Sequence, residues 1–206
     1  AERAFLQQAE NQGIAETLCS YHKTFLGAAK KGLLPKPKCI VYTNLTCDAN
    51  LLTFRTLADF YQVPSFAIDV PWQAGEDSVQ YVAKQLKELR VFLEKNTGKK
   101  ISQEALTQRL VRSKKTLENY EKYQQARADR YVPADLVTPL YAGMTNNLLL
   151  GTAEEEKYTQ QLLENIKKAS ASKGKHIYWM HTIPFWSDAV RKELCFSEKA
   201  QIVGCE

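Results

Sequence analysis

Residues 38–71 constrain the fold of this chain more than any other segment. The segment contains two short runs, 39–43 and 65–70, whose β-branched and aromatic residues predict buried strands. Between them, residues 49–61 carry apolar side chains at helical spacing, with Asp48 as the predicted N-cap. A strand, a helix and a strand in about thirty residues form a βαβ unit with parallel strands. The sequence therefore predicts an α/β fold with a mainly parallel, Rossmann-like sheet.

Helical patterns surround this unit. Residues 1–38 are predicted to form an N-terminal helical segment. Residues 76–170 show helical spacing and no strand pattern of comparable strength, so we interpret them as a large helical insertion in an α/β domain that spans 39–206. The strand pattern returns at residues 176–181 and 201–205, and we expect these strands to join the same sheet.

Composition and charge narrow the possible function classes. Charged residues make up 25% of the 206 residues and apolar residues 44%, which is ordinary for a soluble globular protein. No apolar run approaches the roughly 18 residues of a membrane span, and no signal peptide opens the sequence. The net charge of +5 is scattered, which favours a solvated surface or an anionic ligand over a nucleic-acid stripe. We expect a cytoplasmic protein that binds neither membranes nor nucleic acid.

The five cysteines show neither a CxxC pair nor a dense disulfide framework, so reduced thiols are expected. Cys47 is the strongest candidate for chemistry, because it precedes a predicted helix whose free N–H groups and dipole favour a thiolate. The alternative is a small buried apolar residue. Taken alone, Cys19 is expected to be a core cysteine on a helix. Cys39 and Cys195 are expected to pack in the interior, and Cys205 is a reserve ligand.

Polar side chains near Cys47 and at a second strand end are further candidates. Asn44 and Thr46 either cap the turn around Cys47 or hydrogen-bond a substrate carbonyl. His181 ends a predicted strand, at the edge where sites of parallel sheets usually lie. His22 follows a cysteine by three residues and shares its helical face. Each histidine is expected to be an ordinary surface or core residue, and the alternative for His181 is a role in a substrate site. The catalytic candidates are therefore His181, Asn44 and Thr46.

Five motifs give the chain a specific resemblance. They are Leu18-Cys-Ser-Tyr-His22, Tyr42-Thr-Asn-Leu-Thr-Cys-Asp-Ala-Asn50, Leu52-Thr-Phe-Arg-Thr-Leu-Ala58, Ile68-Asp-Val-Pro71 and Trp179-Met-His-Thr-Ile-Pro-Phe-Trp186. Together they resemble the 2-hydroxyacyl-CoA dehydratase family, which also includes the benzoyl-CoA reductase subunits. The resemblance covers nearly the whole chain.

The resemblance implies that Cys19 and Cys47 bind one 4Fe-4S cluster. In the family a third thiolate comes from a second α/β domain, which we expect to be absent from this chain. The resemblance further implies an oxygen-sensitive lyase that eliminates water from a 2-hydroxyacyl-CoA thioester by radical chemistry. Its implied partners are a related second subunit, which completes a heterodimer, and an ATP-hydrolysing iron–sulfur activator. This sequence has no P-loop of its own, and we expect the chain alone to be inactive.

Two alternatives remain open beside the dehydratase. The first is a subunit of the benzoyl-CoA reductase type, which reduces an acyl-CoA or another small molecule. The second is a non-catalytic scaffold subunit of the same fold. Iron and sulfide analysis after anaerobic purification distinguishes the scaffold from both enzymes.

Overall fold

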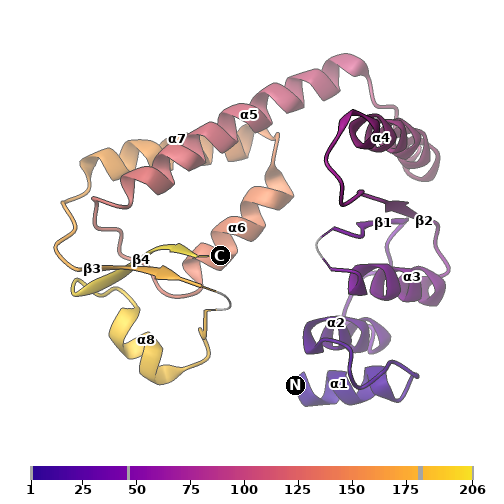
Figure 1. Cartoon of the computed structure of the whole chain (residues 1–206), viewed down its shortest axis with the longest axis horizontal. Coiled ribbons are helices and arrows are strands. Elements are labelled where there is room, and N and C mark those ends of the chain that lie inside the picture. Colours follow the sequence, from indigo (N-terminus) through magenta and orange to yellow (C-terminus); the bar gives the residue numbers. More distant parts are fainter. Residues whose placement is uncertain (1, 46, 181–182, 206) are drawn as a thin grey trace. The chain divides into compact units, whose positions relative to one another are not determined.

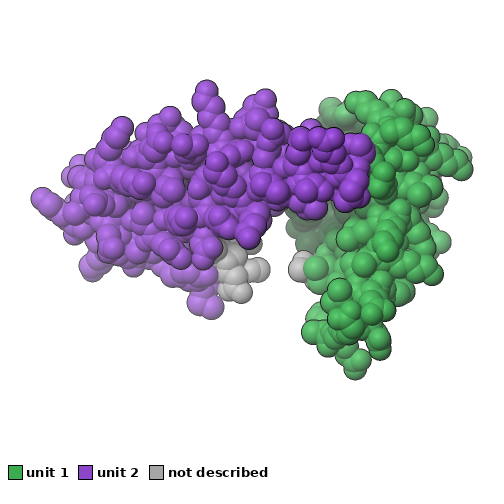
Figure 2. Space-filling model, turned by 90° about the horizontal axis from the view of Figure 1, so that it is seen from above, with its two compact units in different colours: residues 1–101 green, residues 102–206 purple. Residues whose placement is uncertain are grey.

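The computed structural model describes residues 2–45, 47–180 and 183–205. The chain divides into two compact units, unit 1 (residues 1–101) and unit 2 (residues 102–206), which Figure 2 colours separately. Each unit combines helices with short parallel strands, so the predicted mixed α/β class is confirmed. None of the helices in the described residues has the length and apolar character needed to cross a membrane.

Unit 1 has helices on both faces of a two-stranded sheet (Figure 1). Its elements are α1 (Glu2–Glu10), α2 (Ser20–Lys30), β1 (Ile40–Thr43), α3 (Ala49–Tyr61), β2 (Ser65–Ile68) and α4 (Glu76–Thr97). The strands β1 and β2 run parallel, with Ile40 opposite Ser65 and Thr43 opposite Ile68, as the βαβ pattern predicted. Helix α3 packs against β1 on one face, α4 packs against β2 on the other, and α2 and α1 lie beyond α3.

Helix α2 lies at the centre of the unit 1 core. The buried apolar side chains of this core are Ala9, Leu26, Ala29 and Leu57. Helix α1 approaches α2 closely because Gly27 has no side chain, and a Cβ at this position would overlap the carbonyl group of Phe5. Lys23 of α2 adds an ion pair with Glu10 of α1, at 2.6 Å. Apolar burial and this close approach together fix the helix pair from which the candidate site begins.

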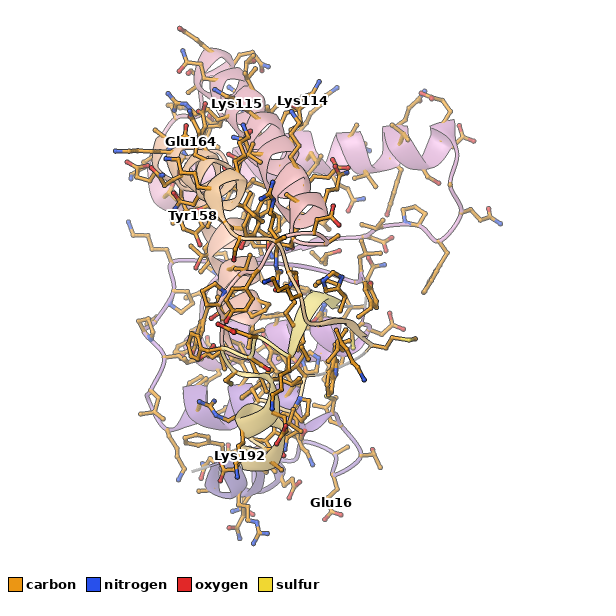
Figure 3. The ribbon with its side chains drawn as sticks, turned by 90° about the vertical axis from the view of Figure 1, so that its left-hand side faces the viewer. Glu16, Lys114, Lys115, Tyr158, Glu164 and Lys192 are labelled. Atoms are coloured by element: carbon orange, nitrogen blue, oxygen red, sulfur yellow. The ribbon has the colours of Figure 1, made fainter. Side chains whose placement is uncertain are left out.

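Unit 2 contains a pair of packed helices and a second two-stranded sheet. Its elements are α5 (Gln103–Ala126), α6 (Thr138–Leu149), α7 (Ala153–Lys168), β3 (Lys175–Trp179), α8 (Asp188–Leu194) and β4 (Ala200–Cys205). Helix α5 packs against α7, and Lys115 forms an ion pair with Glu156 at 2.7 Å. Figure 3 labels Lys114 and Lys115 on α5, and Tyr158 and Glu164 on α7.

The strands pair two by two. In unit 2, β3 runs parallel to β4, with Lys175 opposite Ala200, and α8 connects them as a second βαβ unit. Helices α4 to α7 lie within residues 76–170, and the one isolated antiparallel bridge among the described residues joins Arg130 to Ala171, just beyond this range. Because each sheet in the described part of the chain has two strands, a single Rossmann-like sheet of all four strands stays a prediction. The predicted division of the chain at residue 38 also stays a prediction.

Candidate functional site

Cys19 lies at the N-terminus of α2, where it is the N-cap residue. Its backbone is extended (φ −47°, ψ 133°), and its carbonyl oxygen accepts a hydrogen bond from Lys23 N at 3.1 Å. Its side chain makes no capping hydrogen bond and is exposed. The expectation of a core cysteine inside a helix is therefore wrong, because the helix begins one residue later and directs the thiol to solvent.

Cys47 lies at the N-terminus of α3, between β1 and the first helical turn. Its carbonyl oxygen accepts a hydrogen bond from Asn50 N at 3.0 Å, and its side chain is exposed, so the alternative of a small buried residue is wrong. Asp48 was predicted to cap α3 with its side chain, and this is also wrong. Its backbone is already helical (φ −62°, ψ −23°), and its carboxylate makes no capping hydrogen bond.

Helices α2 and α3 run parallel, so their N-termini lie at the same end of the pair. Three contacts follow in the same order along both helices. His22 meets Thr53, the ring of Phe25 lies 6.0 Å from that of Phe54, and Lys30 Nζ lies 3.9 Å from the ring centre of Phe60. The two exposed cysteines therefore start two neighbouring helices at one edge of unit 1, where both helix dipoles favour negative charge.

His22 connects the two helix starts. Its side chain is buried, with 6% of the residue exposed. One ring nitrogen, Nδ1, lies 2.9 Å from Oγ1 of Thr53, and the other, Nε2, lies 3.8 Å from Sγ of Cys47. The contact between Nε2 and Sγ is weak, but 3.8 Å is still a contact distance for the large sulfur atom. The ring of His22 thus faces Cys47, although it belongs to the helix that Cys19 begins.

Thr53 is the residue that sequence reasoning missed. It is fully buried on α3, on the face that also buries Leu57. Its hydroxyl is the hydrogen-bond partner of the buried imidazole of His22. A single hydroxyl in an apolar helical face is the signal that could have indicated a specific partner, because a buried polar group requires one.

Asn44 braces the loops that follow β1 and β2. Its Nδ2 donates to Oδ1 of Asp69 at 2.6 Å and to the carbonyl of Val70 at 3.3 Å, and its Oδ1 accepts from Val70 N at 2.8 Å. Asp69 also accepts a hydrogen bond from the hydroxyl of Tyr81 at 3.0 Å, and this carboxylate raises the pKa of Tyr81. The geometry gives Asn44 a structural role at the carboxyl edge of the sheet, and its catalytic role stays a prediction.

The other sequence candidates either lie outside the described residues or are only half-buried. His181 and Thr46 lie outside the described residues, as does the side chain of Cys205. Cys39 and Cys195 are half-buried free thiols. Among the side chains that the structure describes, no group of three or more His, Cys, Asp or Glu residues is arranged to hold a metal ion. What unit 1 brings into contact is the exposed thiol of Cys47 and the buried imidazole of His22, while Cys19 begins the helix that carries this imidazole.

The comparisons with known proteins identify the family of the chain. No curated protein matches the chain. A protein-family model described as 2-hydroxyglutaryl-CoA dehydratase, D-component, matches residues 1–206, which is the whole chain. The chain therefore belongs to the 2-hydroxyglutaryl-CoA dehydratase D-component family.

Proposed function

We propose that this chain is the iron–sulfur subunit of a 2-hydroxyacyl-CoA dehydratase, and that Cys19 and Cys47 are ligands of one 4Fe-4S cluster. One observation carries the assignment of the ligands. Both cysteines are exposed, and they begin two parallel, packed helices at the same end. The dehydratase reaction itself is suggested by the family to which the whole chain belongs.

The donor chemistry of this edge suits an iron–sulfur cluster, but the number of donors does not complete one. Thiolates are the usual ligands of such clusters, and the N-terminus of a helix favours a thiolate over a thiol. A cubane takes up to four cysteine ligands, whereas the described part of this edge offers two. The chain would then supply two ligands, and the others would come from another polypeptide segment or from the substrate.

The cluster, when bound, would supply single-electron transfer to the acyl-CoA thioester. The residues of this chain would hold and orient it. His22 would fix the turn that carries Cys47, because its buried ring also contacts Thr53 of α3. Asn44 would keep the two strand-end loops together beside this turn. The exposure of both thiols leaves this edge open to a substrate or to a second subunit.

The proposal includes two protein partners. A family described as a D-component implies a further component, which we identify with a related dehydratase subunit. The sequence has no P-loop, so an ATP-hydrolysing activator would have to supply the electron. The chain alone is accordingly proposed to be inactive.

Anaerobic assay of the assembled enzyme tests this function. The chain is co-purified with its partner subunit, supplied with the activator and ATP, and given 2-hydroxyacyl-CoA thioesters while the unsaturated thioester product is measured. Product formation that Cys47→Ser and Cys19→Ser abolish, and that Cys195→Ser retains, is the expected result. Reduction of the acyl group without loss of water would favour the reductase alternative. Full activity of the Cys47→Ser enzyme would contradict the ligand assignment.

A further inference from the structure

Unit 2 contains a buried cation that has no anionic partner among the described residues. Arg127 follows the last residue of α5 and is 8% exposed. Its guanidinium donates to Oε1 of Gln124 at 2.9 Å and to the carbonyl of Ile202 at 2.5 Å, both neutral acceptors. None of the carboxylates in the described part of the chain forms an ion pair with it. Buried arginines are ordinarily paired with an anion, because removing their charge from water is costly.

The position of this guanidinium is fixed from two sides. Gln201 on β4 donates from Nε2 to the backbone carbonyls of Arg127 and Arg130, at 3.1 and 2.9 Å. Oε1 of Gln201 accepts from Val132 N at 3.2 Å. The buried amide of Gln201 thus ties the end of α5 to β4, while the arginine side chain is itself tied to β4 through Ile202. A donor held in place before a ligand arrives binds it with a smaller entropic cost.

Arg127 lines a cavity of about 410 Å3 within unit 2. Its aromatic and aliphatic walls include Pro139, Tyr178, Val203 and Gly204. The ring of Tyr178 packs on β4 at Gly204. A Cβ at position 204 would lie only 2.8 Å from this ring, so the absence of a side chain there makes room for it. The volume is in the range of sites for small organic ligands, roughly 300–1,000 Å3.

A purely structural role explains the hydrogen bonds of Arg127 and the position of its guanidinium 6.0 Å from the ring centre of Tyr123, but none of these contacts supplies a full negative charge. The two acceptors are neutral and could be satisfied by a neutral amide side chain. The C-terminus of α5 attracts a cation, but with only about half an elementary charge. The guanidinium has five N–H donors in a planar fork, of which Gln124 and Ile202 take two. The remaining donors suit the two oxygens of a carboxylate.

We propose that this cavity binds a small organic carboxylate, whose charged group pairs with Arg127 and whose apolar body packs against Tyr178. The ligand class follows from the charges of the lining residues. Arg127 is the one cationic side chain among them, which suits a ligand with a single negative charge. All of the lining residues belong to unit 2, whereas Cys19 and Cys47 belong to unit 1, so the proposal does not rest on the cluster assignment.

Calorimetric titration of the whole chain tests the proposal, with phenylacetate, its neutral analogue phenylacetamide and inorganic phosphate as probes. Saturable phenylacetate binding is expected, with phenylacetamide and phosphate at least about tenfold weaker, because a charge-assisted bond contributes roughly that factor or more. NMR shift changes should centre on the amides of Gly204 and Gln124. This comparison needs no variant. Equal binding of phenylacetate and phenylacetamide, tighter binding of phosphate, or no saturable binding would overturn the proposal.

Variants locate the binding. Arg127→Gln is expected to raise the Kd of phenylacetate about 10- to 100-fold. Lys122→Gln removes the same charge from an exposed position of α5 outside the cavity, and a change within about twofold is expected. Tyr178→Ala removes an exposed wall residue without altering the charge, so it should fold and bind phenylacetate several-fold more weakly. Equal Kd values for parent, Arg127→Gln and Tyr178→Ala would exclude this cavity.

Discussion

Nε2 of His22 lies 3.8 Å from Sγ of Cys47, and the same buried ring lies 2.9 Å from Thr53 through Nδ1. The imidazole therefore links the first turn of α2 to both the start and the interior of α3. Because the ring is buried, its polar contacts lie in a medium of low dielectric and are costly to break. His22 is in this way the residue that couples the two helix starts carrying Cys19 and Cys47.

Replacing Thr53 by valine is expected to destabilise unit 1. The substitution keeps the shape of the side chain but removes the hydroxyl, which leaves Nδ1 of His22 buried without its partner. We expect the free energy of unfolding to fall by about 1–3 kcal/mol, measured by urea denaturation. Thr56→Val, at a half-buried position of the same helix, is the control and should change it by less than about 0.5 kcal/mol. Equal losses in both variants would mean that the contact with His22 contributes nothing specific.

Replacing Asn44 by aspartate is expected to loosen the loops after β1 and β2. The new carboxylate would face that of Asp69, which now accepts a hydrogen bond from Asn44 Nδ2 at 2.6 Å. Two neighbouring carboxylates repel each other when both are ionised, so a loss of about 1–2 kcal/mol in unfolding free energy is expected near neutral pH. The loss should shrink at about pH 4, where protonation relieves the repulsion. The exposed control Asn11→Asp should show neither effect. A loss of stability in Asn44→Asp that does not change with pH would argue against repulsion between the two carboxylates.

Glu155 in the first turn of α7 is expected to make stability depend on pH. It is 1% exposed, and burial raises the pKa of its carboxyl above the ordinary value of glutamate. With a raised folded-state pKa, the stabilising contribution of the neutral carboxyl is fully present below the unfolded pKa and is lost as pH rises through the folded pKa. Glu155→Gln stays neutral, so it should be more stable than the parent by about 1–2 kcal/mol at about pH 8 and show no gain at about pH 4.

Urea unfolding at both pH values measures this difference. Glu154→Gln, which changes an exposed carboxylate in the same helical turn, is the control and should give no gain that grows with pH. A gain in Glu155→Gln that is the same at both pH values would contradict a raised pKa.

Two helical glycines are expected to respond to alanine in opposite directions. A Cβ at Gly27 would overlap the carbonyl of Phe5, so Gly27→Ala must push α1 away from α2 and should cost about 1–3 kcal/mol. Gly143 in α6 has open space around the position of a Cβ, so Gly143→Ala should stabilise by about 0.5–1 kcal/mol through helix propensity. Thermal unfolding of both variants measures this contrast, and a neutral Gly27→Ala would show that the helix pair can separate without cost.

The βαβ unit of residues 38–71 could be predicted because local signals determine it. The predicted helix 49–61 is α3 as observed, and the two flanking strands are parallel. Their apolar runs are short, the helix carries one apolar face, and a helix between two strands imposes the parallel pairing. Helix α5 begins at a similarly local signal, because the side chain of Ser102 accepts a hydrogen bond from Ala105 N at 3.1 Å.

The site could be predicted only in part, because its contacts join distant positions. Cys47 at the start of α3 followed from the local pattern, whereas the contact of His22 with Thr53 spans 31 positions of the chain. The periodicity of apolar residues shows which side chains of a helix are buried, but it does not show which buried side chains contact one another. The exposure of Cys19 was missed for a different reason. The end of a helix shifts by a residue or two without a strong signal, and one residue decides whether a side chain lies inside the helix or caps it.

Iron and acid-labile sulfide analysis of the anaerobically purified chain tests the central claim most directly. The chain is reconstituted with iron and sulfide beside a partner subunit, and Cys19→Ser, Cys47→Ser and the control Cys195→Ser are treated alike. The account predicts about four iron and four sulfide ions in the parent and in Cys195→Ser, as for one 4Fe-4S cluster, and a large loss in the other two variants. Iron and sulfide contents in Cys19→Ser and Cys47→Ser equal to those of the parent would contradict it.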